Sequence, residues 1–130
     1  MRSLDTNILA RWLLRDDPEQ TAIADTIMDG PVEITATVLV ELAWVLQRIG
    51  GMSREDLART LSAILSIDDA YVFDRDGLRW AVDRYRAGAD WPDMVHLLQT
   101  SRARSFVTFD QSMAREAGLR SPIPIELASN

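Results

Sequence analysis

Short apolar segments alternate with helix-like segments along the whole chain, and this alternation limits the possible folds more than any other feature. The segments with extended, apolar character are residues 1–4, 32–35, 71–73, 105–109 and 123–125. Because Pro124 has no backbone donor, the last of these is predicted to be an edge strand. Strands that alternate with helices are typical of α/β domains, in which helices cover both faces of a mainly parallel sheet.

The segments between the predicted strands carry apolar residues at helical spacing. A first helix is predicted to follow Asp5-Thr6-Asn7, and the others cover 18–28, 37–49, 53–65, 74–87, 91–103 and 111–117. Thr37 and Ser53 are predicted to cap two of them. The residues expected to face inward in the second helix are Ala22, Ile23, Ile27 and Met28. A chain of 130 residues has the length of one domain, so we expect a single domain over 1–130 in three layers, with a central sheet of about five short strands.

The composition restricts the chemistry that is available. The chain has 20 acidic and 14 basic residues, no cysteine and one histidine, His96, and every basic residue is an arginine. The missing cysteine excludes thiolate metal sites and thiol nucleophiles, and the missing lysine excludes Schiff-base chemistry. His96 is interpreted as a surface or packing residue. Carboxylates therefore remain as the abundant catalytic groups.

The net charge and the apolar runs also indicate partners and location. A net charge of −6 disfavours general binding of nucleic acid, unless cations held by clustered acids reverse the local field. No apolar run approaches the ~20 residues of a membrane span, and no secretory signal is visible. We therefore expect a cytoplasmic protein without a membrane partner.

Three predicted helix starts carry aspartates. Asp5 follows the first predicted strand, with Thr6 and Asn7 beside it as polar support. Asp90 and Asp93 stand on either side of Trp91-Pro92, at spacing that suits an N-cap and the third helical position. Asp110 follows the strand 105–109, and Thr108 lies on the same side of the strand end and could bond to it. Each of these aspartates could be only a helix cap, or a metal ligand that projects from the end of the sheet.

Glu41 is the acid that is hardest to explain by local structure. No other charge lies within several residues, and its helical neighbours include Val38, Trp44 and Val45. We therefore expect Glu41 on a buried helix face, where the carboxylate needs either an arginine or a divalent cation as a partner.

Considered together, these acids predict a metal site. If they meet at the carboxyl end of a parallel sheet, their charges repel one another unless cations neutralise them. Oxygen ligands without cysteine favour Mg²⁺ or Mn²⁺, ions that suit the hydrolysis of a phosphodiester. The four tryptophans are interpreted as core or interface residues rather than as platforms for bases; they are Trp12, Trp44, Trp80 and Trp91.

Four short motifs in this order resemble the acidic motifs of PIN-domain ribonucleases, and the length resembles that of the VapC-type toxins of type II toxin–antitoxin systems. The motifs are Leu4-Asp5-Thr6-Asn7, Val40-Glu41-Leu42, Asp90-Trp91-Pro92-Asp93 and Val107-Thr108-Phe109-Asp110. The resemblance implies a Mg²⁺- or Mn²⁺-dependent endoribonuclease with a parallel sheet between helices. It also implies a homodimer, an RNA substrate, and an antitoxin that lies across the acidic pocket.

The resemblance assigns a role to each matching residue. Asp5, Glu41, Asp93 and Asp110 match the four catalytic, metal-binding acids, and Asp90 matches an auxiliary ligand. Thr6 and Thr108 match the hydroxyl residues that support the first and last acids. The chain departs from the family pattern at Met94, where alanine is usual, and at Trp91-Pro92.

Other families with an acidic pocket fit less well. Receiver domains and haloacid-dehalogenase-type phosphatases depend on a lysine, which this chain lacks. The remaining alternative is a catalytically silent PIN-like module that binds RNA or a protein. The presence of all four acids favours the enzyme over this alternative.

Overall fold

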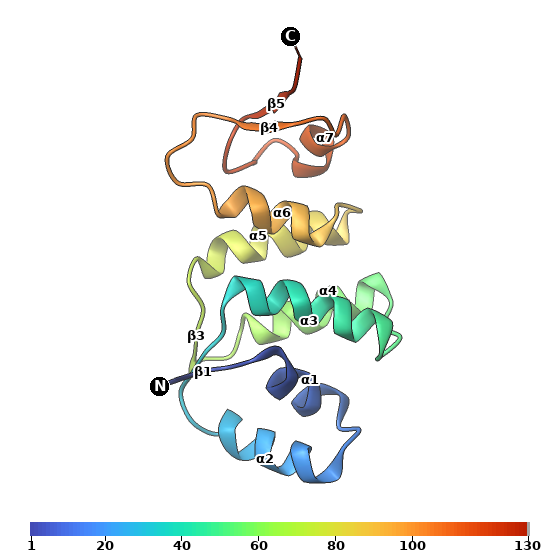
Figure 1. Cartoon of the computed structure of the whole chain (residues 1–130), viewed down its shortest axis with the longest axis vertical. Helices are drawn as coiled ribbons and strands as arrows, with labels where there is room; N and C mark the ends of the chain where they lie inside the picture. The colour runs from blue at the N-terminus through green and yellow to red at the C-terminus, as the bar shows by residue number, and fades with distance from the viewer. Residues whose placement is uncertain (130) are drawn as a thin grey trace. The chain divides into compact units, whose positions relative to one another are not determined.

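The computed structural model describes residues 1–129, in which the chain forms seven helices and five short strands (Figure 1). The chain divides into two compact units, residues 1–75 and a second unit that begins at Asp76. Within residues 1–129, no helix has both the length and the apolar character that a membrane span requires.

The first unit contains a parallel three-stranded sheet in the order β1-β2-β3. Its elements are β1 (Arg2–Ser3), α1 (Thr6–Leu14), α2 (Pro18–Met28), β2 (Val32–Glu33), α3 (Ala36–Arg48), α4 (Arg54–Ile64) and β3 (Ala70–Tyr71). Helix α1 packs on α2 and α3, and α3 packs on α4. The largest fully buried side chains of the unit are leucines and isoleucines from these helices and from the strand ends, among them Leu9, Ile34, Leu42 and Leu61.

The helix starts of the first unit follow local capping chemistry, with one correction. Asp5 and Ser53 are N-caps, and the side-chain oxygen of each accepts a bond from a backbone amide of its helix. The predicted cap Thr37 is wrong, because Thr35 has the extended backbone of a cap and its hydroxyl accepts from the Val38 amide at 3.4 Å. Thr37 lies in the first turn, with its hydroxyl oxygen 3.1 Å from that of Thr35.

The predicted inward face of α2 is wrong at its first two residues, which are exposed, whereas Ile27 and Met28 are half-buried. The residues that it buries are Thr21 and Ala24, whereas Ile23 is 53% exposed. The Thr21 hydroxyl donates to the carbonyl oxygen of Arg11 on α1, so the Thr21 side of the helix is turned toward that neighbour. This long-range bond cannot be seen in the apolar periodicity.

The second unit contains a parallel two-stranded sheet, and its helices pack around aromatic and aliphatic side chains. Its elements are α5 (Arg75–Arg86, of which the first residue is counted with the first unit), α6 (Trp91–Leu98), β4 (Phe106–Thr108), α7 (Met113–Ala117) and β5 (Ile125–Leu127), with β4 paired to β5. Tyr85 and Trp91 meet edge to face, with their ring centres 6.3 Å apart, and both are buried. This contact joins the end of α5 to the start of α6.

Each element of the second unit differs from its predicted bounds by one to five residues, and two of the differences have a visible local cause. Helix α6 ends at Leu98 and not at residue 103; the Thr100 hydroxyl donates to the Leu97 carbonyl just beyond its end. The last strand begins at Ile125, two residues later than predicted. Pro124 stands before it and contributes only its carbonyl, which accepts from the Phe106 amide.

Candidate active site

The start of α6 places two carboxylates close together. Asp90 caps the helix, and its Oδ1 accepts a bond of 2.9 Å from the Asp93 amide. Pro92 lies in the first turn, where no backbone donor is needed. This geometry leaves Asp93 half-buried in the first turn, with its carboxylate on the exposed amino end of the helix. The predicted capping role of Asp90 is therefore confirmed.

The loop after β4 orients a third carboxylate, that of Asp110. Its Oδ1 accepts from both the amide and the hydroxyl of Ser112, at 2.8 and 2.6 Å. The Asp110 amide in turn donates to the Thr108 hydroxyl at 3.0 Å, so Thr108 supports the aspartate through its backbone. The two bonds from Ser112 hold the pKa of Asp110 below its usual range and leave Oδ2 available to a ligand.

Glu116 completes the group, although the sequence interpretation did not include it. One carboxylate oxygen from each of Asp93, Asp110 and Glu116 lies within 4.8 Å of the other two. Helix α7 brings Glu116 back toward Asp110, and the Ser112 hydroxyl lies 3.4 Å from Glu116 Oε1. The Arg84 Nε donates to the backbone oxygen of Glu116 at 2.7 Å and ties α7 to α5. The only signal in the sequence is the four-residue spacing from Ser112 to Glu116, which is too common to identify a ligand.

Crowding of like charges perturbs Asp93. Partial burial raises the pKa of the Asp93 carboxyl, and the charges of Asp90, Asp110 and Glu116 raise it further. His96, one turn along α6, acts in the opposite direction. A group whose charged form is disfavoured in this way is stabilised when a cation binds beside it.

Asp5 lies in the first unit, at the start of α1. Its Oδ1 accepts from the Thr6 amide at 2.8 Å, and both Asp5 and Asn7 are exposed. Thr6 is 2% exposed, and its hydroxyl has no hydrogen-bond partner among residues 1–129. Thr6 thus contacts Asp5 through its backbone amide, and the predicted support by its side chain is not observed within this unit.

Glu41 is exposed, so the prediction that it lies on a buried helix face is wrong. Helix α3 buries the side that carries Leu39, Leu42 and Leu46, against α1 and α4. The helix has more apolar residues than this one side can hold, and Trp44 is left 56% exposed near Glu41. An exposed carboxylate needs no buried partner, and Glu41 remains accessible to a ligand.

The predicted site residues are thus divided between the two units. Asp5 and Glu41 belong to the first, and Asp90, Asp93 and Asp110 belong to the second, together with Glu116. Within the second unit the structure brings Asp93 and Asp110 together as predicted, adds Glu116, and leaves Asp90 outside the group of three. That Asp5 and Glu41 join this group stays a prediction.

The donor set fits a divalent cation that prefers oxygen. Three carboxylates contribute only oxygen atoms, and such sets favour Mg²⁺ or Mn²⁺ over zinc. The pKa of Asp93 is raised by burial and by the charges of its acidic neighbours, and a bound cation would relieve the repulsion between these charges. The second unit, even without residues of the first, therefore holds a set of carboxylates that fits the cation.

Comparison with known proteins identifies the family of the chain. The model of one family, described as PIN domain, matches residues 3–119, which span both units. No curated protein and no solved structure gives a significant match to the chain. Because the match covers most of its length, the chain belongs to the PIN domain family.

Proposed function

We propose that this protein is a Mg²⁺- or Mn²⁺-dependent endoribonuclease that hydrolyses RNA phosphodiesters. PIN domains are generally nucleases, and the chain carries an acidic cluster of the kind that divalent cations bind. The observation that carries the proposal is the convergence of Asp93, Asp110 and Glu116, with the pKa of Asp93 raised by burial and by its acidic neighbours.

We further propose that the two units act as one domain and that Asp5 and Glu41 complete the site. Both side chains are exposed, and they lie on α1 and α3, two helices that pack on one another. Their order in the chain, together with Asp93 and Asp110, is that of the four acids of PIN-domain ribonucleases. In this assignment Asp90 is an auxiliary group that shapes the start of α6.

Each residue has a defined part in the proposed reaction. A bound divalent cation supplies Lewis-acid stabilisation of the charge that develops on the phosphate. Asp93, Asp110 and Glu116 would hold it, and Ser112 fixes the Asp110 carboxylate through two bonds to Oδ1. Arg84 holds α7 in place through the Glu116 backbone. Exposed arginines elsewhere on the chain are the groups available to meet RNA phosphates.

The proposed biological role is that of the toxin in a toxin–antitoxin pair. The support is the resemblance of the four motifs and of the chain length to VapC-type toxins. This role implies a homodimer and a cognate antitoxin that covers the acidic pocket in the cytoplasm. An antitoxin arginine inserted among Asp93, Asp110 and Glu116 would compete directly with the cation.

The test is cleavage of a panel of single-stranded and structured RNAs with Mg²⁺, with Mn²⁺ and with EDTA. We expect metal-dependent cutting that is lost in Asp93→Asn. Asp76→Asn is the matched control, because this acid lies in the same unit and is almost fully exposed. Cutting that persists in Asp93→Asn contradicts the proposed site. If no RNA is cut, a calorimetric Mn²⁺ titration shows whether the wild-type pocket still binds the ion, as expected for a nuclease with a narrow target.

A further inference from the structure

Trp44 is exposed on α3, and an arginine is stacked on it. The ring is 56% exposed, whereas Trp91 of the second unit is 3% exposed. The guanidinium carbon of Arg48, one turn further along α3, lies 5.2 Å from the centre of the Trp44 ring. More than half of Trp44 remains accessible with Arg48 in this position. Trp44 is therefore not a core residue, and of the two roles expected for the tryptophans, core or interface, only that of an interface stays open for it.

Most residues around Trp44 on α3 are polar or charged, and the half-buried Val40, one turn before it, is the apolar exception. A residue advances by about 100° around a helix, so Thr37, Glu41 and Arg48 share the face of Trp44, whereas Ile49 lies about 140° away from it. A helix that docks in a groove needs apolar anchors at successive turns of the surface that it meets. This face offers only Val40 and Trp44, one turn apart, and the turns before and after them carry Thr37 and Arg48, so it does not suit an apolar helix.

A nucleobase suits this face better. Bases of single-stranded RNA stack on aromatic rings and on guanidinium planes, and an arginine beside the ring can also meet a backbone phosphate. Duplex RNA offers no unstacked base for such a contact. Trp44 thus suits the base of a single strand, and Arg48 suits its phosphate.

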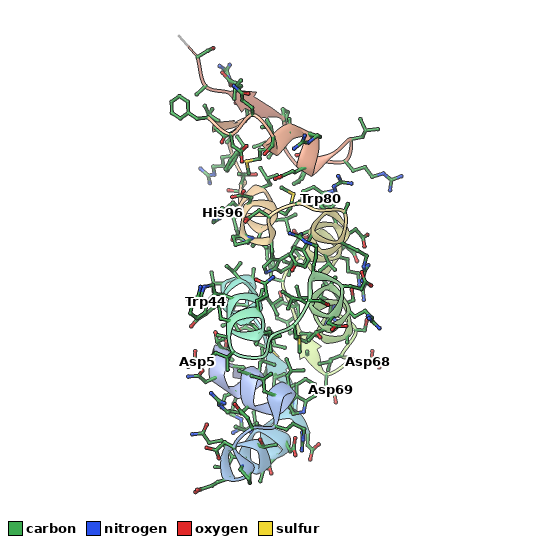
Figure 2. All side chains as sticks on the ribbon, turned by 90° about the vertical axis from the view of Figure 1, so that its right-hand side faces the viewer. Asp5, Trp44, Asp68, Asp69, Trp80 and His96 are labelled. Carbon is green, nitrogen blue, oxygen red and sulfur yellow. The ribbon has the colours of Figure 1, made fainter. Side chains whose placement is uncertain are left out.

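The position of Trp44 connects this face to the proposed site. Glu41 lies three residues before Trp44, a spacing that brings the two Cβ atoms within roughly 5–6 Å of each other. Asp5, the other proposed catalytic acid of the first unit, lies on the same side of that unit as Trp44, whereas Asp68 and Asp69 lie on the opposite side (Figure 2). A base that stacks on Trp44 is therefore held next to Glu41.

We propose that Trp44 and Arg48 form a stacking platform for a base of single-stranded RNA, beside Glu41. This inference rests on the proposed ribonuclease function and specifies its substrate as an unpaired strand. Trp44 is the residue that contacts the base, and Arg48 supports the ring and contacts the neighbouring phosphate.

The test measures RNA affinity by fluorescence anisotropy in the Asp93→Asn background with Mg²⁺, so that no RNA is cut. The probes are fluorescein-labelled ten-nucleotide oligo(U) and oligo(A), and a ten-base-pair RNA duplex. Loss of one stacked base should weaken binding of the single strands to Trp44→Ala roughly 5- to 150-fold. Trp44→Phe should recover most of this affinity, and duplex binding should change little. For Arg48→Gln, the plot of the logarithm of the binding constant for single strands against the logarithm of the salt concentration should be less steep, by about 0.7.

The control is Ile49→Ala, because Ile49 is 62% exposed at the end of the same helix but off the Trp44 face. If Trp44→Ala binds the single-stranded probes as tightly as its Asp93→Asn parent does, the inference is overturned. It is also overturned if neither the Asp93→Asn parent nor the wild-type chain in EDTA binds oligo(U) or oligo(A). Self-association that is lost in Trp44→Ala without a change in RNA affinity also overturns it, and identifies an interface between two copies. If RNA binding depends on Trp44 but the wild-type chain cuts no RNA, the stacking platform is supported and only the proposed ribonuclease function is contradicted.

Discussion

The helix starts at Asp5 and Asp90 are built in the same way, but their surroundings differ. Each aspartate is an N-cap whose Oδ1 accepts a backbone amide of its own helix, at 2.8 Å for Asp5 and 2.9 Å for Asp90. The cap at Asp90 leads to Asp93, which meets Asp110 and Glu116 within the second unit. Asp5 is exposed at the start of α1. The comparison teaches that a capping pattern locates a carboxylate, whereas the packing of distant elements decides whether that carboxylate has acidic neighbours.

The largest expected effect tests whether the first unit takes part in the chemistry. Asp5→Asn and Glu41→Gln should each lower the rate of Mg²⁺-dependent RNA cleavage by at least about 100-fold, because loss of a charge that holds the cation removes several kcal/mol of transition-state stabilisation. Asparagine is also a good N-cap, so the midpoint of thermal unfolding should hardly change in Asp5→Asn. The measurements are initial rates and thermal melts.

The control for these variants is Glu33→Gln, a change of the same kind at a half-buried position of β2 in the first unit. Full activity of Asp5→Asn and Glu41→Gln, beside an inactive Asp93→Asn, would confine the catalytic site to the second unit. In that case only the acids of the second unit would be needed for RNA cleavage.

A smaller effect sharpens the description of the acidic group itself. Glu116→Gln should weaken Mn²⁺ affinity at least about tenfold, a loss that is typical even for residues that only support a metal site. Asp90→Asn should leave the affinity nearly unchanged, since asparagine keeps the cap and Asp90 lies outside the group of three. Isothermal titration of the two variants measures both affinities. If Asp90→Asn weakens Mn²⁺ binding and Glu116→Gln does not, Asp90 is the metal ligand and Glu116 is not.

The smallest effect concerns stability without metal. The pKa of Asp93 is raised in the native state, so the folded chain binds this proton more tightly than the unfolded chain does. The free energy of unfolding therefore falls as the pH rises from the unfolded pKa through the native one, and Asp93→Asn removes this fall. In EDTA, Asp93→Asn should be more stable than the wild type at pH 7, by less than about 1 kcal/mol because the group is partly exposed, and the gain should vanish near pH 3. Urea unfolding at both pH values measures it, and a less stable variant at pH 7 would argue against repulsion in the acidic group.

Much of the fold could be predicted because its signals are local. Ser53 at the start of α4 and Pro18 at the start of α2 mark helix ends through bonds or steric limits within three residues. The end of α6 was placed too late, because no glycine or proline follows Leu98 to mark it, although the Thr100 hydroxyl bonds to the Leu97 carbonyl there. The cap of α3 was misplaced by two residues for a similar reason, because Thr35 and Thr37 are equally good caps by residue type.

The residues of the candidate site also differ in whether local sequence signals reveal them. Asp93 and Asp110 could be predicted because each stands where a strand or loop enters a helix, a position that parallel α/β sheets use for ligands. Glu116 could not, because it reaches the group only when α7 folds back and is tied to α5 through Arg84. The exposure of Glu41 was also missed, since an apolar helix does not reveal which of its sides the neighbours cover.

The alternation of strands and helices, the capped helix starts and the oxygen-only chemistry can be read from the amino-acid sequence, because each depends on residue type and on bonds that span a few residues. The convergence of Asp93, Asp110 and Glu116, and the outward position of Trp44 with Arg48 on its ring, become visible only in the folded chain. Both results follow from which helices pack on which, and that choice depends on burying leucine and isoleucine side chains that lie far apart in the chain.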